Sequence, residues 1–206
     1  MIRYNNKDMA RLGCNECSGC SECCRGMGDS IVLDPWDMYQ LQIATGLAFA
    51  QLMQDKISLH IADGLILPSL KMQEDADICG FLNRDGRCSI HAHRPGLCRL
   101  FPLGRNYDEK GLQYFLLEDA CQVRNRTKVR IRKWLDVESP ASYERFLVAW
   151  HDLRRELQEQ IMVRQSDEYT QRVNVSMLEL FYQKPYDTKI DFYEQFEERM
   201  AEMHIE

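Results

Sequence analysis

Five of the nine cysteines lie within eleven residues near the start of the chain, at Cys14, Cys17, Cys20, Cys23 and Cys24. The first four follow one another at C-x-x-C spacing, which suits neither a core strand nor an amphipathic helix. It does suit a soft metal, because two thiolates two residues apart can ligate one ion or two irons of one cluster. This stretch therefore predicts a metal centre around which the chain must fold.

The vicinal pair Cys23-Cys24 calls for a separate interpretation. Neighbouring side chains on an extended backbone point to opposite faces. The two thiols then either serve different centres, or one of them ligates while the other packs.

Composition limits the classes of protein that the chain can belong to. It has 206 residues, 45% hydrophobic and 28% charged, which suits one sizeable core, alone or with a helical appendage. Residues 1–13 lack the apolar stretch of a signal peptide, and no apolar run approaches the ~20 residues that span a bilayer. We therefore expect a cytoplasmic protein without membrane contact, whose thiols stay reduced and bind metal. The net charge of −6 makes nucleic acid an unexpected partner, and a redox partner or other protein an expected one.

The first half of the chain reads as short mixed elements. Asp34 and Pro35 are typical of a helix start, and Gly46 of its end, with a second short helix at 49–53. Hairpins are predicted at 57–72, turning at Asp63-Gly64, and at 79–90, turning at Asp85-Gly86. Further strands are expected at 99–103 and 112–117.

The second half reads as helical. Apolar stripes predict helices over 123–135, from Ser139 to about 161, over 166–185, and over 187–203. The chain should therefore be α+β: a small cysteine-rich, metal-centred domain with short β-hairpins, followed by a helical C-terminal half. Its expected parts are an N-terminal tail at 1–13, the metal-binding domain at 14–121 and a helical region at 122–206 packed on it.

A distal set of cysteines completes the candidate ligands. Together with four from the first stretch it makes eight, enough for two four-thiolate centres or for one centre with structural thiols. Several of them can alternatively be small buried apolar side chains. The candidate ligands are Cys17, Cys20, Cys23, Cys24, Cys79, Cys88, Cys98 and Cys121; Cys14 is left outside this set.

One set of ordered motifs resembles a known family. These are C-x-x-C-x-x-C-C at 17–24, C-G-F-L at 79–82, C-S-I at 88–90, R-P-G-L-C-R at 94–99 and F-P at 101–102. They resemble the YkgJ-type cysteine-cluster family, a zinc- or iron-chelating domain whose members are often described as iron–sulfur proteins. The resemblance covers 17–121, with His91 where the family is expected to have Tyr. The larger flagellin lysine N-methylases carry a similar cluster.

Cations near these cysteines have an expected role. A four-thiolate zinc site or an oxidised four-iron cluster carries a net charge of about −2, which is costly to bury without donors or cations. Arg94 and Arg99, held around Pro95 and Cys98, are the expected cofactor-binding cations. His91 or His93 can replace a thiolate, although their i, i+2 spacing allows only one to reach a given site.

A basic run at 124–133 permits two interpretations. With a metal site nearby it can belong to a nucleic-acid module. We favour a solvated helix face balanced by the acidic C-terminal helix, because the chain as a whole is acidic.

Three functions remain open. The first is an iron–sulfur protein, with a four-iron cluster preferred, acting in electron transfer or in an enzyme. The second is a zinc-stabilised interaction module without catalysis. The third, S-adenosylmethionine-dependent methylation of protein lysines, rests on the resemblance to the methylases alone. Thiolate ligands do not distinguish zinc from iron.

Overall fold

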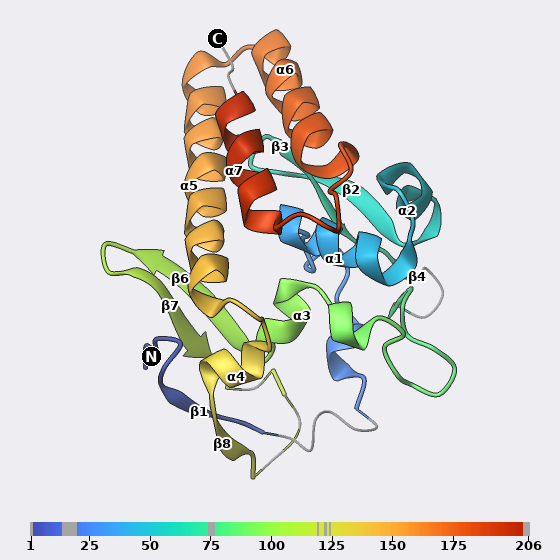
Figure 1. Cartoon of the computed structure of the whole chain (residues 1–206), viewed down its shortest axis with the longest axis vertical. Helices are drawn as coiled ribbons and strands as arrows, with labels where there is room; N and C mark the ends of the chain where they lie inside the picture. Colours follow the sequence, from blue (N-terminus) through green and yellow to red (C-terminus); the bar gives the residue numbers. More distant parts are fainter. Residues whose placement is uncertain are drawn as a thin grey trace.

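The computed structural model describes residues 2–13, 20–73, 77–118, 120–121, 123 and 125–203. Cys14 and Cys17 lie outside the described residues. Figure 1 shows long helices stacked at one end of the molecule and short strands and helices at the other. The α+β class is thereby confirmed, with antiparallel hairpins early in the chain and a helical C-terminal half.

The first half begins with strand β1 and continues through two helices into short hairpins. β2 and β3 form a regular antiparallel pair that runs from Ile57 opposite Leu70 to Ala62 opposite Leu65. The elements are β1 (Met9–Gly13), the 3-10 turn η2 (Glu22–Cys24), α1 (Pro35–Thr45), α2 (Phe49–Asp55), β2 (Ile57–Ala62), β3 (Leu65–Leu70), β4 (Met72–Gln73), β5 (Ile78–Cys79), the 3-10 turn η3 (His91–His93), α3 (Gly96–Leu100), β6 (Leu103–Asp108) and β7 (Gly111–Leu116).

The second half is helical except for its first strand. β8 returns to pair with β1, and the long helix α5 starts at Pro140 as expected. The elements are β8 (Thr127–Arg130), α4 (Ile131–Leu135), α5 (Pro140–Arg164), α6 (Asp167–Leu178), its π-helical continuation η4 (Glu179–Gln183) and α7 (Phe192–Glu202). Within the described residues, none of these helices combines the length and the apolar character needed to cross a membrane.

The predicted start of α1 is confirmed in detail. The Asp34 carboxylate accepts a hydrogen bond from the Asp37 N–H, and the Asp37 carboxylate accepts one from the Asp34 N–H. This reciprocal cap satisfies backbone donors that the helix itself leaves unpaired. Gly46 ends the helix in the left-handed conformation that glycine adopts without strain.

Three of the predicted elements differ in the structure. The hairpin expected at 79–90 keeps only an isolated bridge between Leu82 and Cys88, and Cys79 pairs instead with Met72 of β4. The strand expected at 99–103 is instead helix α3, followed by a strand that starts only at Leu103. Leu97 and Leu100 recur at helical spacing, and both pack into the interior. The helix expected over 123–135 is strand β8 followed by the short α4, because residues 127–130 pair with β1.

Smaller differences concern burial and boundaries. In β2 only Ile57 is buried among the three alternating apolar residues, whereas Leu59 is 39% and Ile61 75% exposed. After Ile57, the polar residues of β2 are therefore less exposed than Leu59 and Ile61. One of them, Ser58, forms a hydrogen bond with Ser69 on the paired strand. The last helix starts at Phe192 rather than 187, because the Asp191 carboxylate caps it.

One hydrophobic cluster joins the two halves of the chain. Leu33, Trp36 and Leu67 from the first half pack in the same cluster as Trp150 and Phe196 from α5 and α7. Burial of this apolar surface is the main force that holds the helices against the cysteine-bearing segments.

A second, smaller cluster lies beneath the β1–β8 pair. Its members are Ala10, Leu12, Leu100, Leu103, Tyr114, Ile131 and Leu135. Residues 9–13, expected to belong to a tail, thus form a strand that contributes the fully buried Leu12 to this cluster.

We expect Leu12→Ala to lower the free energy of unfolding by about 2–5 kcal/mol, because it removes buried methyl groups and leaves a cavity. Met9 is the matched control, since it lies on the same strand but is 51% exposed. Met9→Ala should change stability by about 0.5 kcal/mol or less. Urea unfolding of both variants measures the difference, and equal losses would contradict the burial of β1.

Candidate metal centre

The vicinal cysteines lie on η2, which is anchored to the segment before Cys79. The Sγ atoms of Cys23 and Cys24 are 3.9 Å apart. Directly after η2, Arg25 forms a β-bridge with Ile78, and the Gly26 N–H donates to the Asp77 carbonyl at 2.9 Å. These backbone contacts bring the vicinal pair to the same region as Cys79.

Cys79 and Cys88 lie at the two ends of one loop, as predicted. The Cys79 carbonyl accepts a hydrogen bond from the Leu82 N–H at 2.9 Å, and Leu82 is bridged to Cys88. The Ser89 N–H then donates to the Phe81 carbonyl at 2.8 Å. These backbone contacts close the loop between Cys79 and Cys88.

Cys98 is held by α3, whose first residue is tied to the start of α1. The Gly96 N–H donates to the buried carboxylate of Asp37 at 2.6 Å. A Cβ atom at Gly96 would collide with the Tyr143 hydroxyl and press on Arg105. Glycine is therefore required here by close packing, and Asp37 positions the helix that carries Cys98.

Five thiols share one electrostatic environment; we call Cys23, Cys24, Cys79, Cys88 and Cys98 the five-thiol group. The charges of Cys79 and Cys88 each raise the pKa of both Cys24 and Cys98. Cys23 in turn raises the pKa of Cys79 and of Cys88. The thiols of η2, the 79–88 loop and α3 therefore lie within electrostatic range of one another.

The five-thiol group is not already arranged as a coordination shell. Within the described residues, no set of three or more Cys, His, Asp or Glu side chains has the spacing to hold a metal ion. The chemistry of the donors nevertheless fits one, because clustered thiolates are the ligands that zinc and iron–sulfur clusters select.

The thiol pKa values show that the five-thiol group needs a compensating positive charge to ionise. Burial raises the pKa of Cys79 and Cys88, and it raises that of Cys98 well above the usual range. The hydrogen bond between the vicinal thiols raises the pKa of Cys24 and lowers that of Cys23 to about 7. Thiols shielded from water are neutral until a cation replaces the lost hydration, and a metal ion supplies that charge.

Two cations already lie at the group. The positive charge of Arg94 lowers the pKa of Cys23, and its Nη1 bonds His91. Its buried Nε has no hydrogen-bond partner among the described residues, so it remains available as a donor. Lys56 lowers the pKa of Cys79 and donates to the Gly80 carbonyl at 3.1 Å. Sequence reasoning missed Lys56, because nothing in its local pattern distinguishes it from a surface lysine.

Arg99 occupies a different position from Arg94. Its side chain is 4% exposed and donates to the carbonyls of Arg94 at 3.0 Å, Asp136 at 2.7 Å and Ala92. Its guanidinium also lies over the Trp36 ring, 5.3 Å from the centroid. The structure thus shows Arg99 joining the loop before α3 to the end of α4.

Two other predicted ligands, Cys20 and Cys121, belong to the described residues, whereas Cys17 does not. Cys20 and Cys121 are half-buried, and no hydrogen bond in the described part of the chain joins either to the five thiols. His93 pairs through Nδ1 with Gln40 at 2.9 Å. The carboxylate of Asp37 and the amine of Lys56 are the supporting groups that the motifs did not indicate.

Comparison with known protein families identifies a cysteine-rich domain in the chain. The model of the CxxCxxCC family, described as a "putative zinc- or iron-chelating domain", matches residues 16–131. This segment contains every candidate ligand from Cys17 to Cys121. No curated protein and no solved structure matches the chain with significance.

We expect Arg99→Lys to lower the free energy of unfolding by about 2–3 kcal/mol, since lysine cannot reach three separate carbonyls with one ammonium group. The matched control is Arg145→Lys, at an exposed arginine whose guanidinium donates to the Ser142 hydroxyl. It should change stability by about 0.5 kcal/mol or less. Thermal and urea unfolding of the two variants test this, and equal stability would show that Arg99 does not brace the loop.

Proposed function

The chain belongs to the CxxCxxCC family, and from this premise we propose that its five-thiol group holds an iron–sulfur cluster that exchanges electrons with a partner protein. The family description supports cysteine-ligated zinc or iron. The observation that carries the finer proposal is the gathering of five thiols, four of them half-buried, beside Arg94, whose Nε has no hydrogen-bond partner among the described residues.

Partial exposure of the thiols supports electron exchange. Cys23, Cys24, Cys88 and Cys98 are half-buried, and only Cys79 among the five is fully buried. A cluster bound here would lie near the surface, where a redox partner can approach, and solvent exposure is one determinant of cluster potential.

The residues of the chain have separable roles in this proposal. Cys79, Cys88 and Cys98 with one of the vicinal cysteines supply four thiolates, and the remaining members of the predicted set supply further ligands. Arg94 offers its unpartnered Nε–H to a ligand sulfur, which stabilises negative charge there and raises the reduction potential. When bound, the cluster supplies one-electron redox chemistry.

A zinc-stabilised interaction module is the second candidate. Three short segments meet at the five-thiol group: η2, the 79–88 loop and α3. Each is too short to be stable alone, and a structural zinc ion would join them. Lysine methylation, the third hypothesis, rests on the resemblance alone.

We expect anaerobically purified protein to be brown and to contain iron and acid-labile sulfide, with visible absorption that bleaches on reduction. Cys88→Ser and Cys98→Ser should each lose most of this iron and lower the melting temperature, because metal binding is coupled to folding. Elemental analysis and absorption spectra measure both effects. Cys14→Ser is the control, since Cys14 stands outside the predicted ligand set, and it should retain the iron.

A colourless protein with stoichiometric zinc would refute the iron–sulfur proposal and support the zinc module. Unchanged metal content in both Cys88→Ser and Cys98→Ser would remove these residues from the ligand set.

Metal binding should weaken as the pH falls. The raised pKa values of Cys79, Cys88 and Cys98 mean that these thiols are protonated at neutral pH in the metal-free protein. A metal ion must displace those protons, so affinity rises with pH. Between about pH 8 and pH 6, the apparent affinity for Co²⁺, a spectroscopic substitute for zinc, should fall at least about a hundredfold per unit as two or more protons are taken up. An affinity independent of pH would contradict thiolate coordination.

A further inference from the structure

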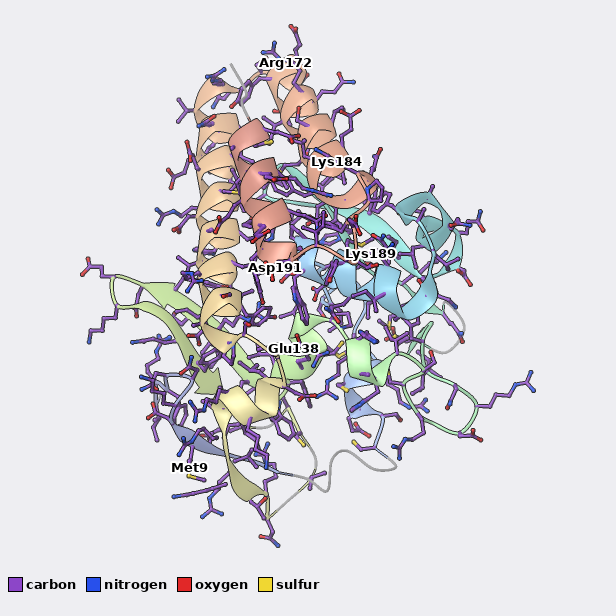
Figure 2. All side chains as sticks on the ribbon, in the orientation of Figure 1. Met9, Glu138, Arg172, Lys184, Lys189 and Asp191 are labelled. Carbon is purple, nitrogen blue, oxygen red and sulfur yellow. The ribbon has the colours of Figure 1, made fainter. Side chains whose placement is uncertain are left out.

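The two-stranded ribbon of β1 and β8 has one apolar face and one basic face. Ala10 and Leu12 point to the interior, whereas Arg11 lies opposite Lys128 and Met9 lies opposite Arg130 on the exposed face. Figure 2 shows Met9 on this ribbon, at the end of the molecule away from the tips of α5 and α6. Further exposed cations come from the N-terminal residues and from α4. We call Arg3, Lys7, Arg11, Lys128, Arg130, Arg132 and Lys133 the basic face.

The short α4 is attached to the same surface. The Arg132 N–H donates to the Asn6 carbonyl at 2.9 Å, and the Ile131 N–H donates to the Asp8 carbonyl at 3.0 Å. These bonds hold the start of α4 beside the residues that precede β1. The cations of α4 and of the N-terminal segment therefore belong to one surface.

The described residues do not neutralise the basic face through ion pairs. None of its seven cations forms an ion pair with a described residue. Residues 123–135 contain six cations and no acid, although the whole chain has a net charge of −6. The positive charge is therefore concentrated in one part of an otherwise acidic protein.

The acidic C-terminal helix does not cover this face, contrary to the balance expected from the sequence. α7 packs against α1, α5 and η4, and its Glu202 pairs with Lys184 at 2.8 Å. Figure 1 shows α7 well separated from β1 and β8. The basic run is also divided between a strand and a short helix, so it is not one solvated helix face.

Repulsion between like charges on β1 and β8 lowers the stability of the ribbon. Like charges directly opposite each other on paired strands destabilise the pair, and Arg11 opposite Lys128 is such a case. Lysines on an edge strand can serve to prevent aggregation. That role needs a few charges on the strand itself, whereas the basic face extends over the N-terminal segment, β8 and α4.

We propose that the basic face binds the phosphate backbone of a nucleic acid. Protein interfaces are anchored by buried aromatic and apolar side chains. Among the described residues, the exposed large apolar side chains beside these cations are Met9 on the ribbon and Ile2 next to Arg3. A surface with many arginines and lysines and so few apolar anchors suits a regular polyanion that is recognised by charge. Strands β1 and β8 carry no aromatic side chain, which predicts that the ribbon contacts phosphates without base stacking. The proposal is independent of the metal, and it replaces the expectation that net charge makes nucleic acid an unexpected partner.

The test measures binding of the full chain to fluorescently labelled oligonucleotides of about 20 nucleotides by anisotropy, over a range of salt concentrations. Single-stranded RNA, single-stranded DNA and duplex DNA of one sequence form the three arms. The triple variant Arg11→Gln, Lys128→Gln, Arg130→Gln should weaken binding at least about tenfold in low salt. It should also lower the slope of log affinity against log salt by about 3, one for each phosphate contact.

The matched control removes three exposed cations elsewhere, with Lys110→Gln, Arg145→Gln and Lys189→Gln. Lys189 lies away from the ribbon in Figure 2. The control should keep the wild-type salt slope and at least about half of the affinity, since long-range effects of net charge are screened by salt. Circular dichroism and melting curves establish that both triple variants are folded.

Each outcome decides the proposal. Salt-dependent binding that the ribbon variant loses and the control keeps supports it, and the preferred arm identifies RNA or DNA. Absence of binding in all three arms at low salt overturns it, as does an equal loss in both variants. Displacement by polyglutamate as effective as that by unlabelled oligonucleotide would also overturn it and assign the face to an acidic protein. Binding to vesicles of anionic lipid without binding to oligonucleotides would assign it to a membrane surface.

Discussion

A buried carboxylate connects the fold to the candidate metal centre. Asp37 is 1% exposed, and its oxygens accept hydrogen bonds from the N–H groups of Gly96 at 2.6 Å and Asp34 at 3.0 Å. Burial and the neighbouring Asp34 raise its pKa well above the usual range, which shows that placing the charge there is costly. Backbone donors and the nearby Arg105 offset the cost. Through this bond the first turn of α1 sets the position of α3, and so of Cys98. Helix α3 thereby has a fixed position relative to the vicinal cysteines and the 79–88 loop.

The sequence predicted correctly those elements that depend on neighbouring residues. It failed for elements whose structure depends on pairing with a distant segment. The cap at Asp34, the glycine stop at Gly46 and the hairpin around Asp63-Gly64 were all readable, because each depends on residues within a few positions. The helix predicted over 123–135 was wrong since β1, more than a hundred residues earlier, pairs with 127–130 and turns that segment into a strand. Tertiary contacts override a helical stripe in such cases.

The sequence indicated the five cysteines that the structure brings together, but not the residues that support them. Motif spacing identified the cysteines and the family, and Arg94 lies beside Cys23 as a compensating cation. The motifs did not indicate Lys56 or Asp37, because these residues act through the folded chain from positions outside the cysteine pattern. Arg99 shows the converse. Its place next to Cys98 in the sequence suggested a cofactor contact, whereas its hydrogen bonds join the loop before α3 to the end of α4.

The hydrophobic cluster that spans both halves has a consequence for how such a cysteine module can spread in evolution. The family match ends at residue 131, yet Leu33, Trp36 and Leu67 within it are covered by Trp150, Phe196 and their neighbours beyond it. A gene fusion that transplanted the matched segment alone would carry the ligands but leave their apolar support open to water. Inheritance of the metal-binding motif therefore depends on a cover that has no cysteine of its own.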